Sequence, residues 1–279
     1  MPVPPEIAWR IAERVLPAAE RQRLADLVFR DEGHGYDAFG LHPAHVALGL
    51  ALTAPLYDAW FRVISRGIEH VPSSGAAILA ANHAGTLPLD AMMIWTDVLR
   101  RTTPPRVLRP VADHFVPNLP WIGTFFTRGG MVGGSRGNAR ALLEAGNLLL
   151  VFPEGTPAIG KPFSERYHLL EWRVGHVELA IRHGVPVVPV AVVGSEEQMP
   201  QVGRIPFLRP FGAPYLPIPL TPVPLPVRYH IHYGAPVRFD SRPDQADDPG
   251  VLSEAASRVR SAVEDLLQAG LRMRQGLFA

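Results

Sequence analysis

Short apolar runs alternate with segments of helical periodicity through the middle of the chain. The apolar runs, which predict buried strands, lie at 76–81, 105–112, 147–152 and 185–193. The segments whose apolar residues recur at helical spacing lie at 88–100, 136–146 and 169–183. A further strand is expected at 227–233 and a terminal helix at 250–274. This alternation predicts an α/β fold with a largely parallel central sheet flanked by helices.

The N-terminal part has a different pattern. Residues 5–30 predict a helix with a break at Pro17, and the glycine-containing segment 31–40 predicts a loop. Residues 44–66 predict an apolar helix, and its apolar stripe comprises Val46, Leu50, Tyr57, Phe61 and Ile64. This stripe, followed by basic residues, is typical of a helix that lies in a membrane interface, and packing on the core is the alternative. We therefore expect an N-terminal helical, membrane-associating lobe at 1–66 and an α/β domain at 67–279.

The proline-crowded segment 200–226 fits neither pattern. Its prolines make it too rigid for a helix, and its apolar residues make it unlike a solvated linker. No apolar run in the chain reaches the roughly 20 residues that a transmembrane helix needs.

Composition narrows the class of protein. The chain has 279 residues, 47% hydrophobic and 19% charged, with a mean hydropathy of +0.08, which is apolar but short of an integral membrane protein. A net charge of +1 provides no overall basic field, so nucleic acid is not an expected partner. The absence of cysteine excludes disulfides, a thiol nucleophile and cysteine-bound metal. With no signal-peptide pattern at its start, the chain is expected on the cytoplasmic face of a membrane as a peripheral or monotopic protein.

The first candidate site follows the strand at 76–81. That strand ends at Asn82-His83, and Asp90 follows after a glycine and a proline. Strand ends in α/β sheets are where ligands bind, and a histidine with a nearby carboxylate is a base with an orienting partner. The alternative is a histidine that caps the next helix, with Asp90 as an ordinary N-terminal helix charge.

Two more loops carry candidate chemistry. Phe152-Pro153-Glu154-Gly155-Thr156 follows the strand at 147–152 and so belongs to the same sheet edge as His83. Another segment runs from Gly123 to Arg128 and continues into two glycines. An arginine held beside glycines can form two parallel hydrogen bonds to phosphate.

These loops, followed by the Val185–Val193 strand with Pro186 and Pro189, resemble in content and order the motifs of the glycerolipid (lysophospholipid) acyltransferase family. The resemblance covers roughly half of the chain. It implies that His83 is the general base that takes the proton of an acceptor hydroxyl, and that Asp90 orients and charges it. The hydroxyl would attack the thioester of acyl-CoA or acyl carrier protein, so no separate cofactor is expected.

The resemblance also implies a substrate-binding set. Arg128 would hold the phosphate of a lipid acceptor, and the residues that shape the surrounding pocket would be Asn82, Gly123, Glu154, Gly155 and Thr156. The implied partners are a lipid acceptor, an acyl thioester donor and a membrane surface.

This sequence departs from the family pattern at two positions. Asp90 stands further from His83 than the family motif places it, so the intervening loop, with Gly85 and Pro88, must bulge for the carboxylate to reach the ring. Pro157 stands where the family has an arginine, and Lys161 or Arg166 is expected to supply that cation.

Other motifs point to other activities. Gly155 to Lys161 matches the start of a phosphate-binding loop, but Pro162 replaces the required Ser or Thr. Ser135 lies in a sequence that matches a nucleophile elbow, so a serine hydrolase or thioesterase of acyl esters is the main alternative, although a helix N-cap fits Ser135 better. His230 and His232 lie on one strand face without a third ligand, which argues for half-exposed strand histidines rather than a zinc site. A non-catalytic lipid-binding protein of the same fold is the third possibility.

Overall fold

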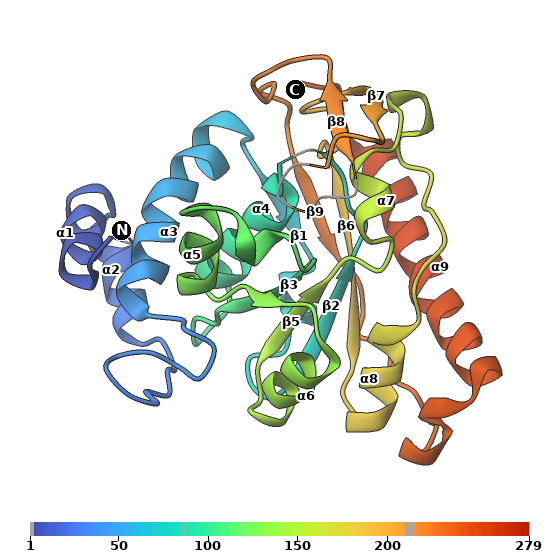
Figure 1. Ribbon diagram of the computed structural model, residues 1–279, viewed down its shortest axis with the longest axis horizontal. Helices are drawn as coiled ribbons and strands as arrows, with labels where there is room; N and C mark the ends of the chain where they lie inside the picture. The colour runs from blue at the N-terminus through green and yellow to red at the C-terminus, as the bar shows by residue number, and fades with distance from the viewer. Residues whose placement is uncertain (1–2, 86, 210–211, 213–214, 279) are drawn as a thin grey trace.

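A seven-stranded sheet organises the chain, and its strand order is β1-β9-β6-β2-β5-β3-β4 (Figure 1). The computed structural model describes residues 3–85, 87–209, 212 and 215–278. The strands of this sheet are β1 (Ile64–Arg66), β2 (Ala77–Ala81), β3 (Leu108–Ala112), β4 (Val132–Gly133), β5 (Leu148–Val151), β6 (Val187–Val193) and β9 (His230–Tyr233). Neighbouring strands run parallel except β6 and β9, which are antiparallel. The predicted largely parallel sheet is confirmed.

Helices cover both faces of the sheet, which gives three layers. One face carries α4 (Leu89–Arg101) and α3 (Pro43–Pro55), and α1 (Pro5–Val15) and α2 (Ala18–Ala25) pack on the outer side of α3. The other face carries α6 (Arg136–Glu144), α8 (Gly175–His183) and α9 (Pro249–Met273). Two short helices, α5 (Ile122–Arg128) and α7 (Thr156–Ile159), lie in loops. Strand β2 is fully buried, and its side chains alternate between the two faces of the sheet. Leu79 packs on the face covered by α3 and α4, and Ile78 packs on the face covered by α6, α8 and α9.

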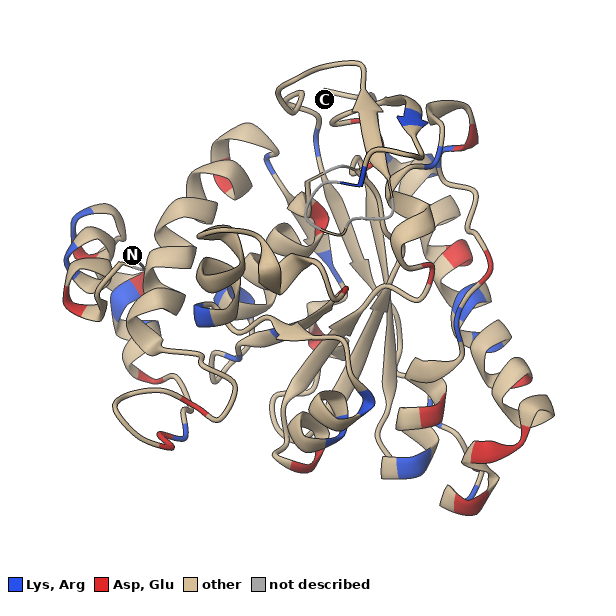
Figure 2. Cartoon of the chain, viewed as in Figure 1, with Lys and Arg blue, Asp and Glu red and all other residues tan. Residues whose placement is uncertain are grey.

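The apolar segment 44–66 is not one helix. Helix α3 ends at Pro55, a turn of π-helix follows at Leu56–Trp60, and residues 64–66 form β1, which pairs with β9. The stripe that the sequence offered for a membrane interface lies in the core instead, where Val46 and Phe61 are fully buried. Helix α3 carries no charged residue, unlike α8 and α9, because it is covered by its neighbours (Figure 2). The expected N-terminal lobe thus ends in a strand of the central sheet.

A buried carboxylate links β1 and β9 to α4. Asp97 of α4 is fully buried and accepts hydrogen bonds from the hydroxyls of Tyr57 (2.5 Å), Ser65 (2.7 Å) and Tyr233 (2.8 Å). Burial, and then the Asp97 charge, raise the pKa of Tyr57 well above its usual range, so its hydroxyl remains a donor. The cluster fastens the π-turn, β1 and β9 to one helix.

The proline-rich segment forms an element that the sequence did not predict. Strands β7 (Gln201–Ile205) and β8 (Leu216–Pro219) pair antiparallel as a separate two-stranded sheet. Several of its apolar side chains are exposed. Among the described residues, no helix combines the length and the apolar character needed to cross a bilayer.

Replacing Asp97 tests the importance of the buried cluster. Asp97→Ala should lower the free energy of unfolding by about 2–4 kcal/mol, because buried hydroxyls lose their acceptor. Urea denaturation followed by circular dichroism measures this change. The matched control is Asp265→Ala on the exposed face of α9, for which we expect a change within about 0.5 kcal/mol. Equal unfolding midpoints for the two variants would show that the cluster contributes little.

Candidate active site

His83 and Asp90 form a hydrogen-bonded pair at the carboxyl edge of the sheet. His83 Nδ1 lies 2.7 Å from Asp90 Oδ2. Asp90 is fully buried and also accepts from the backbone N–H of Ala84 (3.0 Å) and Ala91 (2.7 Å). Because this carboxylate acts as an acceptor toward every partner, Nδ1 carries the proton and donates it. The lone pair of the ring is then on Nε2, the nitrogen that a general base uses.

The longer spacing between His83 and Asp90 is accommodated by the loop that joins β2 to α4. Gly85 has a φ of +88°, and a Cβ there would come within 2.9 Å of the side chain of Gln198. Only glycine adopts this left-handed conformation without strain. Pro88 then precedes α4, and Asp90 lies in its first turn. The bulge expected from Gly85 and Pro88 therefore does bring the carboxylate to the ring.

The surroundings of His83 determine its ionisation. Burial lowers the pKa of the ring, but the charge of Asp90, its hydrogen bond and the more distant Glu154 and Asp113 outweigh burial, so the net pKa is raised. The ring stacks on Phe152 with the ring centroids 4.1 Å apart. This aromatic contact fixes one face of the imidazole and leaves its side chain only 13% exposed.

Glu154 connects the loops around His83. Its Oε1 accepts from the backbone N–H of His83 (3.3 Å), and its Oε2 accepts from that of Leu170 (2.8 Å). The side chain is almost completely buried. Glu154 thus holds three chain segments in place at the carboxyl edge rather than projecting freely from it.

Asn82 and Gly123 also have packing roles. Asn82 donates from Nδ2 to the carbonyl of Val192 (3.1 Å) and accepts at Oδ1 from its N–H (2.8 Å), so the side chain extends the contact between β2 and β6. Gly123 lies against Pro117, where a Cβ would come within 2.2 Å of the carbonyl oxygen. These contacts explain why an amide and a glycine occupy the two positions.

A cation that the sequence motifs missed lies against the loop after β5. The guanidinium of Arg173 lies against Gly155, with its Cζ 3.0 Å from the position that a Cβ would occupy. Gly155 has a φ of +64°. The Arg173 side chain is exposed and makes no hydrogen bond or ion pair to the part of the chain that the structure describes. Thr156 beside it donates its hydroxyl to Asp113, at the end of β3. No local pattern joins residue 173 to this loop, because they meet only through folding.

The other expected cations occupy different environments. Arg128 lies over the ring of Tyr36 at 4.0 Å and donates to the carbonyl of Gly40 (3.4 Å), so it faces the N-terminal loop. Arg166 is half-exposed and lies over Phe163 at 4.5 Å. Neither guanidinium forms an ion pair closer than 4.0 Å with the described residues.

Lys161 requires a correction. Its ammonium is buried, 3.0 Å from a carboxylate oxygen of Glu196, and donates to the carbonyl of His168 (2.9 Å). Burial raises the pKa of Glu196 to about 7, although Lys161 acts in the opposite direction. Lys161 therefore neutralises a buried carboxylate and is not the free cation that the sequence suggested as a replacement at Pro157. Its buried ion pair also removes it from any phosphate-binding loop.

The remaining alternatives have ordinary structural explanations. Ser135 is the N-cap of α6 and accepts from the N–H of Asn138 (3.1 Å), with an extended backbone instead of a strained elbow. His230 and His232 are buried, not half-exposed, and His232 lies against Gly270 of α9. Within the described ranges, no group of three or more potential ligands could hold a metal ion.

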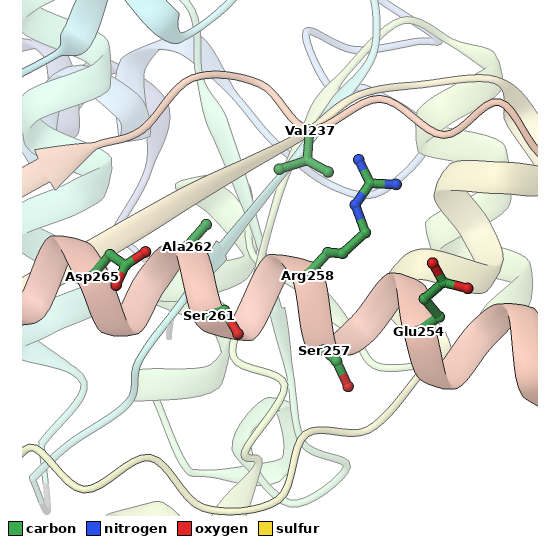
Figure 3. Close-up of a pocket in the computed structure, with 7 residues that line it drawn as sticks. All are labelled: Val237, Glu254, Ser257, Arg258, Ser261, Ala262 and Asp265. Atoms are coloured by element: carbon green, nitrogen blue, oxygen red, sulfur yellow. The ribbon is translucent and has the colours of Figure 1, made fainter.

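A surface hollow lies elsewhere, along α9 beside Val237 (Figure 3). Glu254, Arg258 and Asp265 line it, and the loops around His83 contribute nothing to it. It is separate from the candidate active site.

The α/β fold, with its loops gathered at the carboxyl edge of the sheet, is the architecture that the acyltransferase resemblance of the motifs implied. Comparison with known proteins agrees. A family model described as Acyltransferase matches residues 62–193. The chain is similar to an uncharacterized protein of Mycobacterium tuberculosis, 37% identical over 260 residues, covering 88% of this chain and 72% of that protein. The chain belongs to the acyltransferase family that this model describes.

Two further proteins with descriptive names are similar to the chain. A Gallus gallus protein named DGAT1/2-independent enzyme synthesizing storage lipids is 28% identical over 215 residues, covering 75% of this chain and 60% of that protein. The crystal structure of the 1-acyl-sn-glycerophosphate acyltransferase PlsC from Thermotoga maritima has the same fold, with a TM-score of 0.56 and 19% identity. That match covers 92% of this chain and 89% of that chain. The protein is accordingly an acyltransferase.

The pH dependence of turnover tests the role of Asp90. A general base must be neutral, so the rate should rise with pH as His83 loses its proton, and the raised pKa places this rise above the usual range for histidine. Asp90→Asn removes the carboxylate that raises the pKa. The acid limb of kcat/KM should therefore move to lower pH, while the plateau falls about 10²–10⁴-fold. An unchanged profile would exclude the pair from catalysis; Asp265→Asn is the control.

Proposed function

We propose that this protein transfers a fatty acyl group from acyl-CoA or acyl carrier protein to a hydroxyl of a lysophospholipid or a related glycerolipid. The observation that supports this proposal most is the His83–Asp90 pair, in which a buried carboxylate fixes the imidazole with Nε2 available. The positions of the neighbouring loops, which follow β3 and β5, favour an acceptor that lies across the carboxyl edge.

The proposed step balances without a cofactor. His83 Nε2 takes the proton of the acceptor hydroxyl while the oxygen attacks the thioester carbonyl carbon. The resulting tetrahedral intermediate collapses with cleavage of the C–S bond. The thiolate leaves and receives the proton from the imidazolium, so the products are an ester and a free thiol. Asp90 remains ionised throughout and stabilises the imidazolium.

Two observations bear on the acceptor. Pro157 and the buried Lys161 remove two cations from the segment after Thr156, where Arg166 stays half-exposed, and Arg173 provides a cation beside Gly155. A guanidinium at this position suits a phosphate or another anionic group of the acceptor. The name of the Gallus gallus relative refers to storage lipids, which makes a neutral glyceride the competing acceptor.

A product assay tests the function directly. Purified protein is incubated with labelled acyl-CoA or labelled acyl carrier protein and with lysophosphatidate, monoacylglycerol or diacylglycerol, and the lipids are separated. We expect a labelled ester with at least one acceptor. Release of free fatty acid alone, independent of acceptor, would favour a thioesterase.

His83→Ala should abolish most acyl transfer while leaving the fold intact. Loss of a positioned general base costs on the order of 10²–10⁴ in rate. Ser135→Ala is the matched control, because its hydroxyl caps α6 and is worth about 1 kcal/mol of stability. Its kcat should remain near that of the wild type. Near-full activity of a folded His83→Ala variant, or covalent labelling of Ser135 by a fluorophosphonate with loss of turnover, would contradict the assignment.

Arg173→Gln tests the proposed anion contact. With a phosphorylated acceptor, KM should rise about 10-fold or more, because a charged hydrogen bond is lost. The KM for a neutral glyceride should not change. Arg140→Gln, on the exposed face of α6, is the control. If the variant uses both acceptors as the wild type does, Arg173 makes no contact with the head group and the neutral glyceride becomes the preferred acceptor.

A further inference from the structure

The β7–β8 hairpin presents a group of exposed apolar side chains. We define the apolar rim as Val202, Phe207, Leu208, Ile218, Leu220 and Val223. Phe207 is 85% exposed, the largest exposure among the large apolar side chains that the structure describes. Trp60 lies at the base of the rim, where its indole donates to the carbonyl of Pro224 (3.2 Å). Exposed apolar patches of this kind mark interaction surfaces.

The rim is joined to the loops of the candidate active site. Tyr215, which precedes β8, donates its hydroxyl to the carbonyl of Thr156 (2.5 Å). A Cβ at Gly212 would lie 3.7 Å from that of Phe115, in the loop after β3. That loop continues to Trp121, which is 75% exposed. Figure 1 shows the hairpin at the same end of the molecule as α7, which begins at Thr156. The exposed apolar residues therefore border the edge at which His83 lies.

The side-chain charges of the same segment are all positive. Residues 198–239 contain no aspartate or glutamate, and the hairpin carries the exposed Arg204 and Arg209. Apolar side chains flanked by arginines favour a surface that is apolar inside and negatively charged outside. An anionic bilayer has this character, whereas a second copy of the chain would bring the same arginines together.

We propose that the apolar rim inserts into the interface of a bilayer that contains anionic lipid, and so holds the His83 edge toward the membrane. This rests on the proposed function only in that a lipid acceptor would then reach His83 from the bilayer. The apolar rim takes the place of the apolar stripe at 44–66 as the expected membrane contact, because that stripe is buried in the core.

Vesicle flotation with the full chain tests the proposal. Vesicles of phosphatidylcholine alone are compared with vesicles that also contain phosphatidylglycerol. The wild type should float with the anionic vesicles, and salt should weaken this binding because surface charges are screened over about 10 Å at 0.1 M. The double variant Phe207→Ser/Leu208→Ser should bind about 10²-fold more weakly, since two large apolar side chains no longer insert. Arg204→Gln/Arg209→Gln should lose the preference for anionic lipid.

The matched control is Val28→Ser, an exposed apolar residue in the N-terminal segment away from the hairpin. It should float like the wild type. Wild-type flotation of the Phe207/Leu208 variant would overturn the proposal, as would a rim-dependent dimer in sedimentation without any flotation. If the wild type floats, the Phe207/Leu208 variant does not, and neither transfers an acyl group, the docking surface is supported and the proposed function is refuted. The two inferences can therefore fail separately.

Discussion

The carboxylate of Asp90 is the point on which the candidate active site depends. A buried, ionised carboxylate is costly unless hydrogen bonds satisfy it. Here the bonds come from the imidazole of His83 and the backbone N–H groups of Ala84 and Ala91, so satisfying the charge also closes the β2–α4 loop. The same interaction raises the pKa of the ring and orients it. Loop conformation and chemical reactivity therefore cannot be separated at this position.

The sequence predicted the parts of this arrangement that are local. Buried strands that end just before Asn82 and Phe152 must bring the following loops to one edge if they are parallel neighbours, as β2 and β5 are. Gly85 predicted a bulge in the loop between His83 and Asp90. Arg173 could not be found in this way, because it reaches Gly155 from a segment with no motif of its own. The burial of Lys161 depends on Glu196, a partner that also lies far away in the sequence.

The misplaced membrane contact has a related cause. An apolar stripe at helical spacing predicts burial, but it does not say whether lipid or protein covers it. In this chain the partner is protein, since Asp97 fastens the end of that segment to α4 and β9. The hairpin gave no such signal, because its prolines mask strand periodicity. Its exposed side chains become evident only when β7 and β8 pair.

Buried charges separate the residues that build the site from those available to a substrate. Glu154 and Lys161 both lie near the candidate active site, yet each is already neutralised or bonded by protein groups. Withdrawing either from its partner would leave an uncompensated buried group, which costs several kcal/mol. Such residues cannot also bind a substrate charge without losing their own partner. The exposed guanidinium of Arg173 has no such partner among the described residues, so it can form an ionic contact with an anionic ligand without breaking one within the protein.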